Sequence, residues 1–233
     1  EIVVVEEMAD GVYLLGGGPA NSYMVEFKDW VAVFDAPINE KRSLAVIEEV
    51  VKLAPNKPIR WLISSHPHFD HIGGLRTYMH IGSTIITHRK NIEMLNRDVL
   101  KYRTQHIEPD ITSMWPPTEL AEGYNYEAIN ENFVITDNER ILHVHYVQPL
   151  GHVQGMLMAY LPEEKIAFQA DLFDTHEAPP AEPTPAMQTF FNQIQRMSLD
   201  IETIAPSHGQ PVPYSNFIDA MGEGARMCET VIS

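Results

Sequence analysis

The chain has 233 residues, of which 44% are hydrophobic and 21% are charged, and these values suit one globular domain over residues 1–233. Its 16 basic and 32 acidic residues give a net charge of −16, which repels polyanions and argues against a nucleic-acid partner. No run reaches the ~18 uninterrupted apolar residues that a membrane-spanning helix needs, so we expect no membrane partner.

Cysteine content and the start of the chain bear on the compartment. With Cys228 as the sole cysteine, no internal disulfide can form, which is compatible with a reducing compartment without requiring one. The chain begins at Glu1 without a signal-like apolar stretch. A cytoplasmic location and a secreted or periplasmic location after signal removal therefore both stay open. We expect a monomer or a homodimer.

The first half of the chain predicts strands followed by mixed elements. Residues 1–35 alternate short apolar runs with turn signals, which indicates consecutive antiparallel strands. Residues 39–54 have apolar positions near helical spacing, and Pro55 ends this pattern. We expect a buried strand at 59–63, a helix opening at 72–78, a strand at 83–87 and a helix at 89–103.

The second half predicts a further β-rich region with helices after it. Strands are expected at 131–136, 140–147, 156–161 and 165–170, a helix from 186, a return through 201–204, and a final helix at 214–230. Two segments with several prolines, 106–126 and 174–186, fit neither strand nor helix. They are interpreted either as lids over a pocket or as surface excursions.

Residues 66–71 are the strongest chemical signal in the chain. They form the run His-Pro-His-Phe-Asp-His, which directly follows the apolar strand at 59–63. Imidazole and carboxylate together are ligands of zinc and similar divalent ions. A loop at the end of a strand can direct such side chains to one point, so this spacing predicts a metal site.

Further donors occur where later strands pass into loops. His152 and His208 each stand beside a glycine, and Asp171 ends the apolar run at 166–170. If these strand ends meet at one sheet edge, they join His66, His68, Asp70 and His71. Seven ligands are too many for one tetrahedral zinc and suit two ions with a shared water.

This set of motifs, in this order and over nearly the whole chain, resembles the metallo-β-lactamase superfamily of hydrolases. The resemblance implies an αββα sandwich, an α/β fold of two mixed β-sheets flanked by helices, with a dinuclear metal centre at one edge. It implies three ligands for each ion and one bridging carboxylate. The first ion would be held by His66, His68 and His152, the second by Asp70, His71 and His208, and Asp171 would bridge them.

Two features place the chain within this family. Asp171 follows Ala170 where the family usually has glycine, which leaves the ligand in place. Cys228 lies far from the motifs, which argues against the β-lactamase subclass with a cysteine ligand. The other dinuclear β-lactamase type typically lacks the bridging Asp. Its presence favours the esterase, lactonase and thioesterase branches, and β-lactam hydrolysis stays as an alternative.

The expected chemistry is hydrolysis of an ester-like bond in a small molecule by two Zn²⁺ ions, with Fe or Mn as possible substitutes. A metal-bridging hydroxide is the expected nucleophile, since metal coordination lowers the pKa of water toward neutrality. Asp70 is the expected catalytic residue, which orients the hydroxide and takes or relays its proton within roughly 3 Å. The expected substrates are lactones or carboxylic esters first, thioesters second and organophosphates third.

Other interpretations also stay open. An iron-dependent redox or sulfur-oxygenating enzyme of the same fold is an alternative, although the diiron branch usually replaces the second motif histidine with Glu and His68 is intact. A binding module with a vestigial site predicts missing ligands, and none is missing. His143 and His145 alternate on one strand and favour a polar sheet face over a metal site. Asp35 either holds a ligand histidine or caps a turn.

Overall fold

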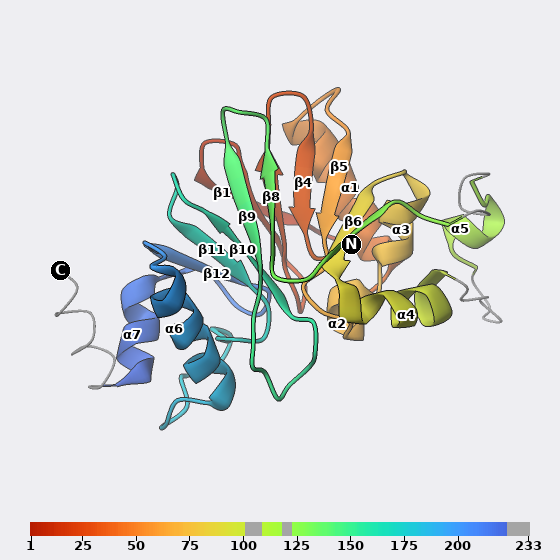
Figure 1. The fold of residues 1–233 in the computed structure, drawn as a ribbon. Coiled ribbons are helices and arrows are strands. Elements are labelled where there is room, and N and C mark those ends of the chain that lie inside the picture. The colour runs from red at the N-terminus through yellow and green to blue at the C-terminus, as the bar shows by residue number, and fades with distance from the viewer. Residues whose placement is uncertain (101–108, 118–122, 223–233) are drawn as a thin grey trace.

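The computed structural model describes residues 1–100, 109–117 and 123–222 (Figure 1). The strands are β1 Val4–Ala9, β2 Val12–Gly16, β3 Ser22–Glu26, β4 Val31–Phe34, β5 Ile59–Ile63, β6 Thr84–His88, β7 Tyr126–Ile129, β8 Asn132–Thr136, β9 Ile141–Tyr146, β10 Leu157–Leu161, β11 Ile166–Gln169, β12 Thr203–Pro206 and β13 Val212–Pro213. The helices are α1 Glu40–Leu53, α2 Phe69–Ile72, α3 Leu75–His80, α4 Ile92–Met94, α5 Ile111–Met114, α6 Pro185–Met197 and α7 Tyr214–Met221, with a 3₁₀ turn η1 Arg89–Asn91 and a π-helical turn η2 Leu95–Leu100.

The strands form two mixed sheets. Over the described residues, the first sheet has the order β1-β2-β3-β4-β5-β6-β7, antiparallel from β1 to β4 and parallel from β4 to β7. The second has the order β13-β12-β11-β10-β9-β8, antiparallel except for the parallel pair β11 and β12. The two sheets face each other across a shared apolar layer.

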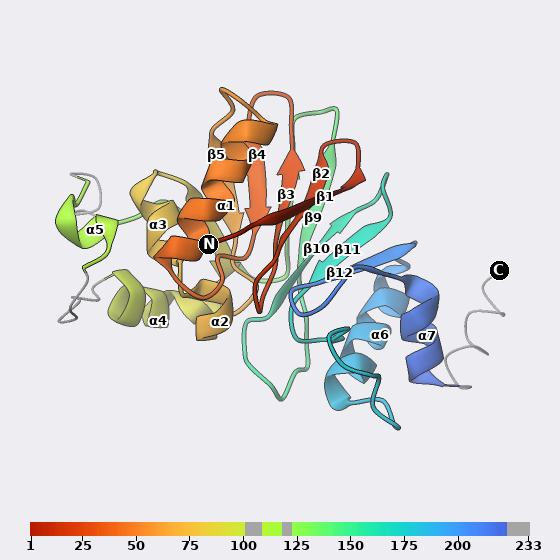
Figure 2. The ribbon, with the colours of Figure 1, turned by 180° about the vertical axis from the view of Figure 1, so that it is seen from behind.

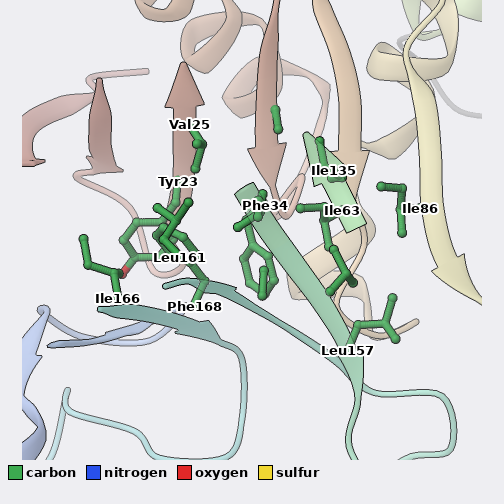
Figure 3. Packing of buried hydrophobic residues seen from close by; sticks show 14 of the residues in the cluster. Tyr23, Val25, Phe34, Ile63, Ile86, Ile135, Leu157, Leu161, Ile166 and Phe168 are labelled. Carbon is green, nitrogen blue, oxygen red and sulfur yellow. The ribbon is translucent and has the colours of Figure 1, made fainter. Parts of the chain in front are cut away.

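Aromatic and branched side chains from both sheets fill this layer. Tyr23 and Phe34 of the first sheet pack on Phe168 of the second, with ring centroids 5.1 and 6.1 Å apart (Figure 3). Alternating side chains of a strand point to opposite faces of its sheet, so each sheet has a second apolar face to cover. The central layer therefore accounts for only part of the core.

Helices cover the two outer faces. α1 and α3 lie on the first sheet and α6 and α7 on the second, which Figures 1 and 2 show from opposite sides. The ends of α6 follow from its sequence, since the side chain of Thr184 accepts from the backbone N–H of Met187, and Pro185 suits the first turn. The expected αββα sandwich of two mixed sheets is confirmed.

Most of the expected elements are present, with three differences. The helix predicted at 89–103 is, up to residue 100, a series of short η1, α4 and η2 turns. The predicted irregular segment 106–126 contains helix α5 and ends at the first residue of strand β7, and the two-residue strand β13 was not expected. Residues 101–103 of the predicted helix, part of the segment 106–126, residues 223–230 of the final helix and Cys228 lie outside the described residues.

The second His-x-His pair lies on β9, as expected for one strand face. The rings of His143 and His145 are stacked, with centroids 5.6 Å apart and planes at 9°. His143 is half-buried and His145 is buried, so this face is less exposed than the expected polar sheet face. Burial, with the nearby His143 and Arg196, lowers the pKa of His145 to about 4.

This lowered pKa predicts an acid-sensitive contribution to stability. His145 binds a proton near pH 6.5 in the unfolded chain but only near pH 4 in the folded chain. The contribution of neutral His145 to the stability of the fold is therefore fully present above pH 6.5 and is lost as the pH falls toward 4. At pH 4.5 we expect a loss of about 2 to 3 kcal/mol. Urea unfolding of metal-free protein at pH 7 and pH 4.5 measures it. His145→Gln should remove most of this loss and His143→Gln should retain it, and equal losses in all three proteins would contradict the assignment.

Candidate metal centre

The site lies where the two sheets meet at one edge. After β5, the backbone carbonyl of Ser65 accepts from the N–H of Leu157 at 2.7 Å, which joins the metal-motif loop to β10. On the neighbouring side, Asn21 donates through Nδ2 to the carbonyl of Gly209 at 2.7 Å, which joins the end of β2 and start of β3 to the loop after β12. These cross-sheet bonds bring loops that are far apart in the sequence to one place.

The structure brings all seven expected residues together in two groups. Donor atoms within each group lie within 4.8 Å of one another. The first group is His66, His68, His152 and Asp171, and the second is Asp70, His71 and His208. His66 and His71 are fully buried, whereas His152 and Asp70 are more open, with side chains 39% and 44% exposed.

Asp171 stands between the two groups. Its Oδ2 lies 3.1 Å from Nε2 of His66 and 2.8 Å from Nε2 of His152. Its Oδ1 lies 3.1 Å from Nε2 of His71 and 3.4 Å from Nε2 of His208. One oxygen of the carboxylate therefore faces each group, and the Oδ1 atom is buried without a hydrogen bond.

The spacing of the second group fits a tetrahedral ion. Asp70 Oδ2, His71 Nε2 and His208 Nε2 are separated by 3.3 to 3.5 Å, and Asp171 Oδ1 completes the set at 3.1 and 3.4 Å. Ligands bound tetrahedrally at 2.0–2.2 Å are about 3.3–3.6 Å apart. The first group is somewhat tighter, with Nε2 of His66 3.0 Å from Nδ1 of His68.

Hydrogen bonds on the outer ring nitrogens fix which atoms face the centre. Nδ1 of His208 lies 3.0 Å from the carbonyl of Pro19, and Nδ1 of His71 lies 2.9 Å from Oδ2 of Asp35. These partners can only accept, so both Nδ1 atoms carry hydrogen. When the rings of His71 and His208 are neutral, their Nε2 lone pairs face each other and the carboxylates of the two aspartates of the cluster. Acceptors gathered in this way are stabilised by a cation bound between them.

Asp35 supports the loops of the metal centre through its hydrogen bonds. It is fully buried and accepts from the backbone N–H and the hydroxyl of Ser65, from the hydroxyl of Ser207 and from His71. The single hydroxyl proton of Ser65 is given to Asp35, so Ser65 Oγ accepts from Nδ1 of His66 at 3.2 Å. Asp35 therefore holds a cluster histidine, the first of its two predicted roles.

The protonation of the cluster follows from this surplus of acceptors. Burial would lower the pKa of His71, but the nearby carboxylates of Asp171 and Asp35 outweigh it and raise the pKa to about 10. Burial would likewise raise the pKa of Asp171, but the close contacts with His208, His66 and His71 hold it far below its usual range. Positive charge is thus favoured at the centre, and the donor set suits zinc or a similar divalent ion.

Three contributors were not predicted from the sequence. Ser65 and Ser207 each directly precede a cluster histidine, which is the one local signal that could have found them. The carbonyl of Pro19 has no side-chain signal at all. Tyr78 of α3 is fully buried in the apolar layer under α1 and α3, so its hydroxyl is not available to a substrate.

The fold and this donor cluster define the class of protein as a metal-dependent hydrolase. The chain belongs to the metallo-β-lactamase superfamily, because a sequence model described as "Metallo-beta-lactamase superfamily" matches residues 15–208. The matched range includes all seven cluster residues. The resemblance seen in the sequence is therefore confirmed.

Solved structures share the fold at low sequence identity. A metallo-beta-lactamase from Pontibacter korlensis has a TM-score of 0.70 at 15% identity, covering 94% of this chain and 97% of that one. FIM-1 from Pseudomonas aeruginosa, in its mono-zinc form, has a TM-score of 0.67 at 19% identity, covering 97% and 96%. A metallo beta lactamase from Erythrobacter litoralis has a TM-score of 0.65 at 18% identity, covering 94% of each chain. These likenesses concern the fold.

A curated relative is similar over a shorter stretch. A linear primary-alkylsulfatase from Pseudomonas sp. is 35% identical over 71 residues, which are 30% of this chain. The match spans only 10% of that enzyme's length.

Among the described residues, no helix is long and apolar enough to cross a membrane.

Proposed function

We propose that the protein is a dinuclear zinc hydrolase that cleaves an ester-like bond in a small molecule. The observation that carries this proposal is the placement of Asp171, whose two oxygens each face a separate group of donors. A site for a single ion would not require one carboxylate oxygen on each of two donor groups. His66, His68 and His152 would hold one ion, Asp70, His71 and His208 the other, and Asp171 would bridge them.

A pair of divalent cations held by these residues would supply an acidified water and would polarise the oxygen of the scissile group. Among the three residues proposed for the second ion, Asp70 has the most exposed side chain, at 44% against 22% for His208 and none for His71. Asp70 is therefore placed to take a proton from the attacking water. The water oxygen bonds to the carbonyl carbon, the carbon–oxygen ester bond breaks, and the proton passes to the leaving oxygen.

The proposed substrates keep the order of lactones or carboxylic esters, thioesters and organophosphates. Alkyl sulfates are a competing outcome because of the partial match to an alkylsulfatase. β-Lactams and iron-dependent redox chemistry are the other competing outcomes. Since one fold hosts many reactions, the fold alone does not rank them.

A hydrolysis panel on metal-quantified protein tests the proposal. It compares lactones, aryl esters, thioesters, phosphotriesters, alkyl sulfates and β-lactams, each with wild type, Asp70→Ala and His152→Ala. We expect about two zinc ions per chain, and a loss of ester or lactone turnover of roughly 10²- to 10⁴-fold in both variants. Asp200→Ala, which removes an exposed carboxylate that pairs with Lys165, is the matched control and should keep full activity. One iron per chain, or turnover unchanged in both variants, would overturn the proposal.

A further inference from the structure

We propose that the substrate is a neutral or cationic ester that carries an apolar group and no negative charge near its scissile bond. This inference rests on the proposed function and names the substrate class of the same site. It is carried by two independent features, the charge of the loops that surround the centre and one exposed aromatic side chain within the metal motif.

The loops around the centre contain acids and no base. The segments that carry or support the donors are residues 16–21, 66–71, 149–155, 171–184 and 207–211, and none of them contains lysine or arginine. Enzymes that recognise a carboxylate or phosphate on their substrate use arginine or lysine for it. A second anionic group on the substrate would therefore find no cationic partner in these loops.

Three further acids follow Asp171 along the chain, and we propose that they form an acidic rim of the site. Asp174, Glu177 and Glu182 are exposed and belong to the segment after Asp171. The first end of this segment lies against the centre, because the backbone N–H of Thr175 donates to the carbonyl of His208 at 3.2 Å. At its far end, Thr189 of α6 donates to the carbonyl of Pro149, so the segment connects two donor loops.

The basic side chains on the adjoining helical segment are engaged elsewhere. This segment borders the site, since Asn91 donates to the carbonyl of Gly155 at 3.0 Å. Its described basic residues each have a partner, which is Asn130 for Arg89, Tyr146 for Lys90 and Asp98 for Arg97. None of these contacts is directed at the donor cluster.

Phe69 gives the site its apolar contact. It lies between the donors His68 and Asp70 and is 70% exposed, although a phenyl ring gains free energy when it leaves water. Because both of its neighbours in the sequence are donors, its backbone lies at the centre, and its exposed ring is free to meet a substrate bound there. An acyl or alkyl chain on the substrate can cover this ring, and the acidic rim repels the carboxylate product after hydrolysis.

Three 4-nitrophenyl esters of matched length test the charge selectivity. They are the butyrate, the monoester of glutaric acid and the 4-(trimethylammonio)butyrate, which are neutral, anionic and cationic. At low ionic strength we expect kcat/KM for the neutral and cationic esters to exceed that for the anionic ester at least about tenfold, and salt should narrow the difference. An anionic ester that is hydrolysed as well as the neutral one would overturn the inference.

Variants assign the effect to the rim. The triple variant Asp174→Asn, Glu177→Gln and Glu182→Gln should narrow the ratio several-fold. A control that removes the same charge from exposed acids elsewhere, Glu6→Gln, Glu127→Gln and Glu163→Gln, should leave it unchanged. Equal effects of the two triples would contradict the rim assignment. If no ester is hydrolysed by metal-loaded protein, the proposed function itself fails, which is a distinct result.

Chain length tests Phe69. Phe69→Ala should lower kcat/KM for the 4-nitrophenyl hexanoate relative to the acetate by roughly five- to tenfold, since less apolar area is buried on the acyl chain. Val51→Ala removes an apolar side chain of comparable exposure, 56%, from α1. This control should keep the wild-type ratio, and a Phe69 variant with an unchanged ratio would overturn the apolar contact.

Discussion

Replacing Asp171 with alanine should lower the number of bound zinc ions from about two to one or fewer and reduce ester hydrolysis by roughly 10³-fold. The reason is geometric, because Asp171 is the residue with an oxygen on each donor group. In the proposed dinuclear centre, its removal takes one ligand from each ion. Metal analysis after dialysis, together with kcat/KM, measures the two effects on the same samples.

The control separates this loss from a general change of charge. Asp200→Ala also removes one acid. Asp200 is exposed and precedes β12, whereas the donor loop follows β12, so this variant should retain two ions and full turnover. Circular dichroism of both variants checks that they fold. A folded Asp171→Ala protein that still binds two zinc ions and turns over ester normally would rule out the bridging role.

The layered fold could be predicted because its strands carry strong signals. Strands β4, β5, β10 and β11 are short apolar runs bounded by turns, and their buried positions follow from that pattern. Strand β7 was missed, because Tyr126 and Glu127 are exposed and its four residues pair only at the edge of the sheet. Strand β13 has two residues, one of them proline, which gives no strand signal.

The site could be predicted in its residue types and less well in its supports. Histidine and aspartate at strand ends are rare enough in combination to identify the seven donors. Their hydrogen-bond partners come from serine hydroxyls and a backbone carbonyl, as at Ser207 and Pro19. Such groups occur throughout any chain, so only the three-dimensional arrangement shows which of them contact a donor. The tautomers of His71 and His208 follow from these supports and not from the motif.

Asp35 is the support with the largest expected effect. Its φ of 61° lies in the left-handed region, where most side chains are strained and asparagine is tolerated. Asp35→Asn therefore changes the hydrogen-bonding chemistry with little change to the backbone. The amide has one oxygen to accept with and an NH₂ group that faces donors, so at least one of Ser65, Ser207 and His71 loses its acceptor.

We expect Asp35→Asn to weaken zinc binding by about 10- to 100-fold, chiefly at the ion held by His71, and to lower the free energy of unfolding by about 1 to 3 kcal/mol. Chelator competition measures the affinity, and ¹⁵N NMR of labelled histidine reports the His71 tautomer. Val144→Ala, a substitution at a fully buried position between the sheets, provides a comparable loss of stability without a change near the centre. If both variants bind zinc equally well, Asp35 stabilises the fold alone. If only Asp35→Asn loses zinc affinity and its His71 spectrum shifts, the Asp35 carboxylate fixes the His71 tautomer in which Nε2 keeps a lone pair for the metal.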